Sequence, residues 1–343
     1  MDQRRDSLAV WAASQISRLT GVDVPAEIEM VSGDASFRRY FRLRLQGKSW
    51  VCVDAPADKE DNPKFVRIAQ SWRAHGVHVP EVIATEYEQG FMLLEDFGDE
   101  ILWPALHADS TTADDVRSLY QRSIDELIAL QKLPHDDLPS YDDVLLRQEM
   151  ALFPDWLCER QLGLSLSDTT KEMLKRVEHV LVDAALSQPT VVVHRDFHSR
   201  NLMLCADNKI GVIDFQDAVA GPVTYDLVSI LRDCYVRWPD ELVSNLVTSY
   251  WQAATGAGIW NDSLEALQRA FDLMGMQRHL KAAGIFARLN LRDGKAGYMK
   301  DIPNTCRYLR DVAGRYPEFA EFCTWLDTEF LPVLANKLTG SQR

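Results

Sequence analysis

Residues 190–214 read TVVVHRDFHSRNLMLCADNKIGVID, a strand-like island in a part of the chain that otherwise predicts helices. Apolar, partly β-branched runs flank a polar loop, which is typical of short strands. We predict one strand at 201–204, a turn centred on Asp207 and Asn208, and the return strand at 210–213. The stretch therefore predicts a small hairpin that follows a polar loop.

The predicted hairpin places two oxygen-bearing side chains side by side at its open end. With this turn, Asn201 lies opposite Asp214, at a Cβ separation of about 4.5–5.5 Å, and oxygen ligands suit Mg²⁺ rather than zinc. Asp196 precedes Asn201 in the spacing His-Arg-Asp-x-x-x-x-Asn, that of a phosphotransferase catalytic loop. Phosphoryl transfer needs a metal on the phosphates and a carboxylate that accepts the proton of the attacking hydroxyl. We therefore predict Asn201 and Asp214 as metal ligands and Asp196 as the catalytic base.

The same residues have simpler interpretations when they are taken singly. Asp196 and Asn201 are ordinary turn or cap residues in isolation, and Asp214 is an ordinary strand end. Their combined spacing favours the catalytic interpretation. His194 and His198 have the spacing of a metal pair, but the Glu of a His-Glu-x-x-His helix is missing and the loop does not look helical.

Size and charge limit the class of protein. The 343 residues predict about two domains or lobes. The net charge of −14, from 37 basic and 51 acidic residues, argues against nucleic acid or an anionic membrane surface as the main partner. An anionic small ligand stays open, because a metal or a few cations reverse the local field.

The remaining composition indicates a cytoplasmic protein. The first residues lead into an amphipathic stretch and not into an apolar signal core, and no run of 18 apolar residues occurs. The six cysteines contain no Cys-x-x-Cys pair, so we expect neither a disulfide framework nor a zinc site. The sequence leaves the oligomeric state open and favours a monomer.

The patterning outside the island divides the chain into a strand-rich lobe at 1–95 and a helical lobe at 96–343, with a hinge near 94–98; the family resemblance given below implies nucleotide binding by the first lobe and catalysis and substrate binding by the second. The first lobe alternates short strand-like runs with one inserted helix, which predicts an antiparallel sheet. The second lobe shows helical periodicity. The expected fold class is α+β, and cleft sites between lobes are common. Expected strands are 28–31, 37–45, 50–54, 81–86 and 91–94; expected helices are 7–19, 64–75, 112–131, 143–162, 168–187, 224–236, 240–255, 262–291 and 317–336.

The segments HRDFHSRN, IDFQDA and GPVTYDL resemble the aminoglycoside phosphotransferase and choline-kinase-like superfamily. The resemblance spans about 20–335 and implies a two-lobed, protein-kinase-like fold that uses ATP and Mg²⁺. It also implies the roles already given to Asp196, Asn201 and Asp214. His194 and Asp226 would support the catalytic loop; a cap on the helix that starts at Tyr225 is an equally good interpretation of Asp226.

The first lobe matches the superfamily less closely. The loop that would cover the phosphates is Ser32, Gly33, Asp34, Ala35 and Ser36, and the adenine would bind backbone near Glu95 and Phe97. A plain hairpin turn explains the loop equally well. The Lys expected on the third strand is missing, and Asp54 stands near its place. Alternation puts Arg38, Tyr40 and Arg42 on one face of their strand and Arg39 on the other. Among the remaining cations, Arg38, Arg39, Arg42 and Lys48, we favour Arg39 as the phosphate contact.

The runs GDASFRRYFRL, LLEDFGD and LRQEMALFPDWLCERQLG resemble bacterial anomeric kinases of amino sugars. This resemblance implies N-acetylmuramate or N-acetylglucosamine as the acceptor, phosphorylation at the C1 hydroxyl and a role in peptidoglycan recycling. N-acetylmuramate carries a carboxylate, and the candidate cations for it are Arg147, Arg160 and Arg200.

Three alternatives stay open. The acceptor is another small alcohol, such as an aminoglycoside, choline or homoserine; the chain is a nucleotide-binding pseudokinase, which the missing Lys favours; or it is a helical interaction protein. No Ala-Pro-Glu follows Asp214, and Gly221-Pro222 comes soon after it, so a protein substrate is not expected. The role of Arg195 stays open.

Overall fold

The computed structural model describes residues 2–33, 37–206 and 208–340. The chain forms two compact units. The first unit is Met1–Thr111 with Arg200–Asp217, and the second is Thr112–Ser199 with Ala218–Arg343. The hairpin of the 190–214 segment therefore belongs to the same unit as the N-terminal sheet, although it lies about a hundred residues further along the chain. The functional division at residue 95 stays a prediction.

The first unit contains a five-stranded antiparallel sheet of order β1-β2-β3-β5-β4. Its elements are α1 (Gln3–Thr20), β1 (Glu29–Gly33), β2 (Arg39–Leu45), β3 (Lys48–Asp54), α2 (Asn62–Ala74), β4 (Val82–Glu86), β5 (Phe91–Glu95) and α3 (Leu102–Leu106). All five expected strands and both expected helices are present. The inserted helix and the short connections agree with the expected pattern.

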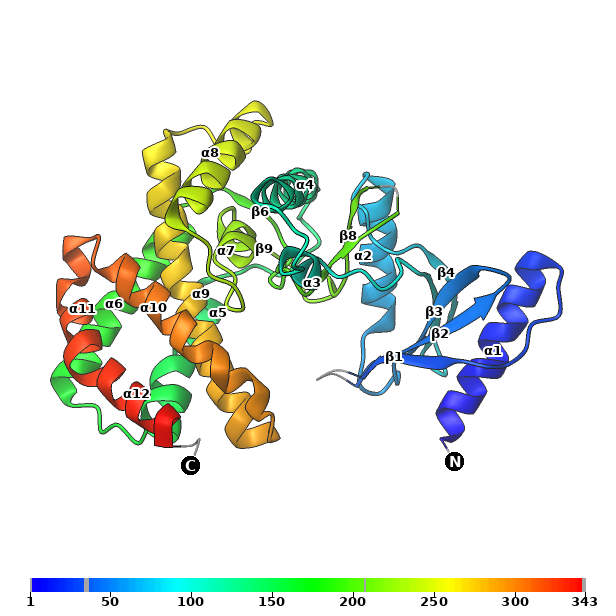
Figure 1. The fold of residues 1–343 in the computed structure, drawn as a ribbon, viewed down its shortest axis with the longest axis horizontal. Coiled ribbons are helices and arrows are strands. Elements are labelled where there is room, and N and C mark those ends of the chain that lie inside the picture. Colours follow the sequence, from blue (N-terminus) through cyan, green and yellow to red (C-terminus); the bar gives the residue numbers. More distant parts are fainter. Residues whose placement is uncertain (1, 34–36, 207, 341–343) are drawn as a thin grey trace. The chain divides into compact units, whose positions relative to one another are not determined.

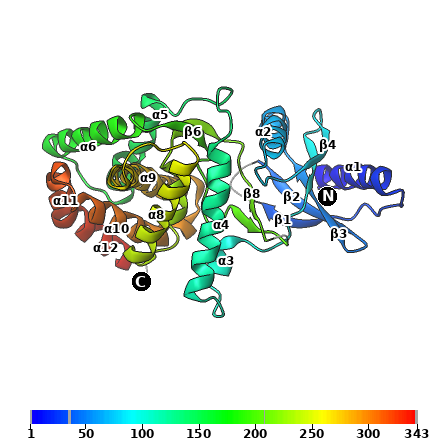
Figure 2. The same ribbon diagram turned by 90° about the horizontal axis from the view of Figure 1, so that it is seen from above.

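Two helices cover opposite faces of this sheet (Figures 1 and 2). Helix α1 is amphipathic, and its Leu8 and Ile16 pack in one cluster with Phe41 of β2 and Leu93 of β5. Side chains alternate along a strand, so the odd-numbered residues of β2 face α1. The even-numbered residues face α2, and this division decides which cations of β2 share a face with the hairpin.

The hairpin consists of β7 (Leu202–Leu204) and β8 (Ile210–Val212). Its register is one residue off the prediction, because Leu202 pairs with Val212. Cys205 N donates to Lys209 O at 3.0 Å, which makes the loop one residue longer than the predicted turn. Asn208 has a φ of 65°, the left-handed conformation that Asn tolerates. The predicted turn residue Asp207 lies outside the described residues.

The second unit is mostly helical, as expected for an α+β chain of this type. Its elements are α4 (Ala113–Gln131), α5 (Asp143–Met150), η1 (Phe153–Gln161), α6 (Asp168–Leu186), β6 (Thr190–Val193), β9 (Val219–Pro222), α7 (Tyr225–Leu231), α8 (Asp240–Gly256), α9 (Leu264–Asp293), η2 (Ala296–Asp301), α10 (Ile302–Ala313), η3 (Pro317–Phe319), α11 (Ala320–Trp325), η4 (Leu326–Phe330) and α12 (Leu331–Gly340). Strands β6 and β9 pair antiparallel, and the polar loop follows β6.

Helix α10 is not among the predicted elements. Pro303 lies in its first turn, where the missing N–H costs no helical hydrogen bond. The expected helices 143–162 and 317–336 are present but interrupted by π-helical or 3₁₀ turns.

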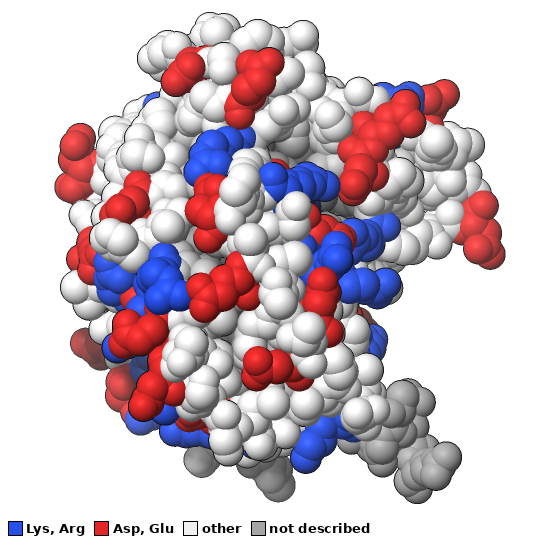
Figure 3. Space-filling view, turned by 90° about the vertical axis from the view of Figure 1, so that its left-hand side faces the viewer, with Lys and Arg blue, Asp and Glu red and all other residues white. Residues whose placement is uncertain are grey.

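Among the described residues, no helix combines the length and apolar character needed to cross a bilayer. On the face drawn in Figure 3, Lys and Arg side chains lie interspersed with Asp and Glu.

Candidate active site

The loop at 194–200, which holds the predicted catalytic base, follows β6 and is fixed by a buried carboxylate. Asp226 accepts hydrogen bonds from His194 N at 2.6 Å and from Arg195 N at 3.1 Å. It is fully buried in the first turn of α7, while Thr224 occupies the N-cap position. Arg195 has a φ of 77°, a strained conformation for a side chain of this size. Asp226 thus holds a turn of backbone that would not persist on its own.

The side chain of His194 also belongs to this loop. It is fully buried, and its Nδ1 accepts a hydrogen bond from Asp196 N at 3.2 Å. The ring therefore supports the backbone of the predicted base.

Opposing effects act on the carboxyl group of Asp196. Burial favours its neutral form, but electrostatic interactions, of which the one with the Lys281 ammonium is the largest, outweigh burial and hold its pKa below the usual value. A carboxyl that is ionised at neutral pH is the form needed to accept a proton. The pKa of Asp226 moves the other way, to about 7, because burial dominates over its two N–H donors.

Arg195 has a partner that the sequence did not indicate. Its Nη2 lies 2.5 Å from Oε1 of Glu149, and Nζ of Lys281 lies 3.0 Å from the same oxygen. Tyr141 donates its hydroxyl hydrogen bond to Glu149 as well. Glu149 lies on the buried face of α5 beside Met150, and a carboxylate on an apolar face is the signal that would have found it. This network joins the catalytic loop to α5 and α9.

The open end of the hairpin brings Asn201 and Asp214 together despite the shifted register. Nδ2 of Asn201 lies 3.4 Å from Oδ2 of Asp214, and Nε2 of Gln216 donates to Oδ1 at 2.8 Å. Asp214 leaves the strand with a φ of 65°, so its side chain does not follow the strand alternation. The carboxylate is exposed. An exposed carboxylate and an amide oxygen suit Mg²⁺, which takes few protein ligands and keeps water and phosphate oxygens.

The predicted base and the predicted metal ligands belong to different compact units. Asp196 lies in the second unit, whereas Asn201 and Asp214 lie in the first. The predicted nucleotide-binding residues also lie in the first unit. The residues predicted to bind the nucleotide and the residue predicted to accept the proton therefore belong to separate units.

The predicted phosphate loop is described only at its start. Ser32 and Gly33 end β1 and pair with Tyr40 and Arg39. The remaining residues, Asp34, Ala35 and Ser36, lie outside the described residues.

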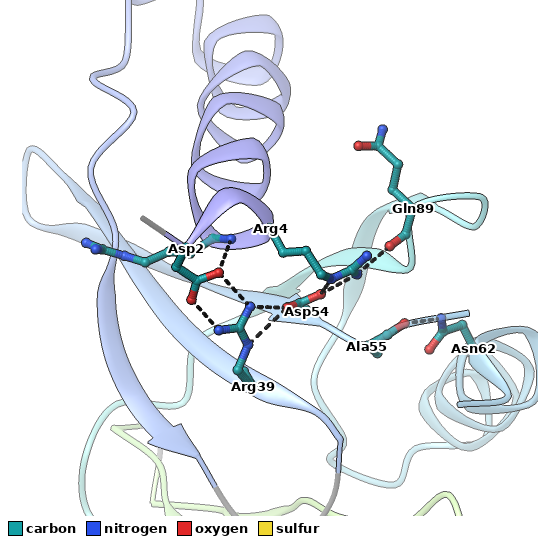
Figure 4. Close-up of polar contacts among 8 residues, drawn as sticks. Asp2, Arg4, Arg39, Asp54, Ala55, Asn62 and Gln89 are labelled. Atoms are coloured by element: carbon teal, nitrogen blue, oxygen red, sulfur yellow. Dashed lines mark hydrogen bonds and ion pairs between the residues drawn. The ribbon is translucent and has the colours of Figure 1, made fainter. Parts of the chain in front are cut away.

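Arg39 lies on the face of the sheet that α1 covers, and its role as a phosphate contact stays a prediction. Its Nη2 is 2.6 Å from Oδ2 of Asp54, and it also pairs with Asp2 (Figure 4). Arg4 of α1 donates from Nε to Oδ1 of Asp54 at 2.9 Å. Asp54, which stands near the place of the expected Lys, therefore ties α1 to the sheet.

The predicted hinge is attached to both α2 and the hairpin. Oε2 of Glu95 forms an ion pair with Nη1 of Arg73 at 2.8 Å, and the backbone N–H of Glu95 donates a hydrogen bond to the carbonyl oxygen of Glu81. Phe97 packs so closely on Gly211 that a Cβ there would lie 2.5 Å from the ring. Glycine at 211 is thus required by this close approach.

The three candidate substrate cations have different surroundings. Arg147 pairs with Asp143 at 2.8 Å and Glu178 at 2.7 Å. The guanidinium of Arg160 lies 4.2 Å from the centre of the Trp156 ring, and that of Arg200 lies 5.5 Å from the Trp103 ring. Arg200 belongs to the first unit. Their contact with a substrate stays a prediction.

A sheet unit with an oxygen-ligand hairpin and a helical unit with a His-Arg-Asp loop define a kinase-like phosphotransferase. The chain belongs to the phosphotransferase enzyme family, whose model matches residues 27–261.

Three relatives of this chain carry the same name. The chain is 46% identical over 327 residues to the N-acetylmuramate/N-acetylglucosamine kinase of Pseudomonas putida. This alignment covers 93% of this chain and 95% of the relative. The chain is 45% identical to the protein of that name from Pseudomonas aeruginosa, with the same coverage. The relative from Neisseria meningitidis is 41% identical and covers 86% of this chain and 88% of its own.

Solved structures confirm the kinase-like fold. An ethanolamine kinase of Plasmodium vivax matches with a TM-score of 0.60 and 11% identity, over 86% of this chain and 84% of that one. The ADP-bound aminoglycoside phosphotransferase APH(2'')-Ib matches with a TM-score of 0.54 and 16% identity, over 88% and 98%. These likenesses concern the fold alone.

Proposed function

We propose that this kinase transfers the γ-phosphate of ATP to the anomeric hydroxyl of N-acetylmuramate or N-acetylglucosamine. The product is the sugar 1-phosphate, and the role is cell-wall recycling. The identity of the acceptor is supported by the name that two relatives share, which are 46% and 45% identical to this chain over 93% of its length. The catalytic loop and the hairpin supply residues that suit such a transfer.

In the proposed mechanism each unit has its own task. Asn201 and Asp214 hold Mg²⁺, which neutralises charge on the phosphates. Asp196 orients the anomeric hydroxyl and takes its proton as the oxygen attacks the γ-phosphate. The lowered pKa of Asp196 keeps it ionised for this role. The backbone clamp by Asp226 and the ring of His194 hold Asp196 in place.

The proposed partners are ATP and one small sugar, and the proposed location is the cytoplasm, where ATP is available. A net charge of −14 disfavours a nucleic-acid or membrane partner. A monomer suffices for this proposal, because each candidate residue comes from one chain.

An acceptor panel tests the function. ADP release is measured with ATP–Mg²⁺ and, in turn, N-acetylmuramate, N-acetylglucosamine, an aminoglycoside, choline and homoserine. Turnover is expected with the N-acetylated amino sugars only, and the 1-O-methyl glycosides, which lack the reacting hydroxyl, are the matched inactive controls. Faster turnover of an aminoglycoside, choline or homoserine would assign the chain to another acceptor. ATP binding without any turnover would favour a pseudokinase.

A further inference from the structure

Strand β3 lacks the cation that a kinase-like nucleotide site needs. In protein kinases, a Lys on the third strand contacts the ATP phosphates and pairs with a Glu from a nearby helix. Here the end of β3 reads Val51-Cys52-Val53-Asp54, and Lys48 is exposed at the other end of the strand. Asp54 faces α1. A cation for the phosphates must therefore come from another element of the first unit.

Arg38 offers that cation next to a carboxylate. It directly precedes β2 and is 3% exposed. Its Nη2 lies 3.0 Å from Oε2 of Glu60, which stands just before α2. Its guanidinium also lies 5.3 Å from the centre of the Phe65 ring. A buried cation, a carboxylate before the helix and an aromatic ring thus occur together on the α2 face.

The same face leads to the candidate metal ligand Asp214. Phe65 stacks on Phe215, the residue after Asp214, with ring centres 4.8 Å apart. Arg38, Phe65 and Phe215 therefore lie in successive contact, and Phe215 directly follows Asp214 in the chain.

The other arginines at 39–44 are less suitably placed to contact the phosphates. Arg39 lies on the α1 face with Asp2 and Asp54. Arg42 lies on the same face as Arg38, but it pairs with Asp96 at 2.6 Å beside the hinge. Arg44 has a side chain that is 57% exposed near the far end of β2.

We propose that Arg38, positioned by Glu60, binds the phosphates of the nucleotide whose Mg²⁺ is held by Asn201 and Asp214. Arg38 takes the place of the missing β3 Lys, and Glu60 is its positioning residue. A guanidinium has five N–H donors in a planar fork, so it serves a carboxylate and a phosphate at once. The proposal rests on the proposed ATP-dependent function.

The test is a series of ligands that differ only in phosphate number. Dissociation constants for adenosine, AMP, ADP–Mg²⁺ and ATP–Mg²⁺ are measured by calorimetry for the wild type and Arg38→Ala. Loss of a charged, two-pronged contact is expected to weaken ADP and ATP binding about 10- to 100-fold. Adenosine affinity should stay within about twofold, because no phosphate is involved. A structural role would weaken all four ligands alike.

Companion variants sharpen the result. Arg44→Ala, on the strand that Arg38 directly precedes, is the control and should leave all four affinities unchanged. Glu60→Gln should weaken ADP and ATP binding less than Arg38→Ala does. If Arg38→Ala does not fold, Arg38→Lys replaces it in the test. An ammonium lacks the planar set of N–H donors of a guanidinium, so ADP and ATP affinities should still fall. Adenosine affinity should not change.

Three results overturn the proposal. One is unchanged ADP and ATP affinity in Arg38→Ala, and another is an equal loss for adenosine. The third is a phosphate-selective loss in Arg39→Ala that Arg38→Ala does not show, which would restore the assignment made from the sequence. Failure of the proposed function looks different, because then the wild type itself binds no ATP or phosphorylates no acceptor.

Discussion

Asp196 is the residue on which the proposed chemistry depends most. Asp196→Asn keeps the shape of the side chain and removes its ability to accept a proton. Turnover should fall by about 10²- to 10⁴-fold, while ATP affinity stays within about twofold of the wild type because the residues predicted to bind the nucleotide lie in the other unit. Steady-state ADP release and calorimetry measure the two effects. Asp183→Asn on α6, with an exposed side chain, is the matched control, and normal turnover in Asp196→Asn would refute the assigned role.

Asp226 gives a prediction about pH and stability. Its pKa is about 7 in the folded protein against an ordinary value of 3.8. Between these values the unfolded carboxyl loses its proton and the folded one keeps it, so ionisation favours unfolding. The stability that this group contributes is complete below about pH 4 and is lost as the pH rises through about 7.

The measurement compares the Tm of the wild type and Asp226→Asn between pH 4 and 8. The wild type should lose stability relative to the variant as the pH rises to 7, and the difference should level off above that. A difference that is constant, or that changes in the opposite direction, contradicts the raised pKa.

The sequence predicted the pairing of Asn201 with Asp214 better than it predicted the surroundings of the arginines before and in β2. Spacing alone indicated Asp196, Asn201 and Asp214, and alternation correctly separated Arg38 from Arg39. Alternation does not say which face a helix will cover, and helix α1 covers the face of Arg39. Glu149 was missed because its partners are distant in the chain.

At the scale of elements, the contact between hinge and hairpin is sharply testable. A Cβ on Gly211 would lie 2.5 Å from Cδ2 of Phe97, so Gly211→Ala should destabilise the first unit by about 1–3 kcal/mol. Thermal unfolding and ATP affinity report the effect. Combination with Phe97→Ala should recover part of the loss, because the clash is with this ring. Strict additivity of the two substitutions would show that the ring is not the cause.

The elements themselves were predictable where one periodicity ran uninterrupted. Helix α4 follows such a pattern, with Val116, Tyr120, Ile124 and Leu127 on its buried face. The hairpin register was missed by one residue, because loop length decides register and a loop with Asn208 in the left-handed conformation is one residue longer. Helix α10 was missed because Pro303 reads as a helix breaker, although the first turn accepts proline.

At the scale of the whole molecule, a substitution in one unit should impair the function proposed for that unit and leave the function proposed for the other unchanged. Asp214→Ala removes the predicted metal carboxylate from the first unit. It should abolish turnover and remove the gain in ATP affinity that Mg²⁺ provides, while binding of N-acetylmuramate stays within about twofold. Calorimetry with sugar alone and with ATP, each with Mg²⁺ or with a chelator, separates these effects. Loss of sugar binding in Asp214→Ala would contradict this division of tasks.

The position of the transferred phosphate tests the central claim most directly. N-acetylmuramate is incubated with ATP, Mg²⁺ and the protein, and the product is analysed by ³¹P and ¹H NMR. We predict one ADP for each phosphate transferred, a phosphorus coupled to the anomeric proton, and loss of the reducing end. A phosphate on any other hydroxyl, or consumption of ATP without a phosphorylated sugar, would contradict the account.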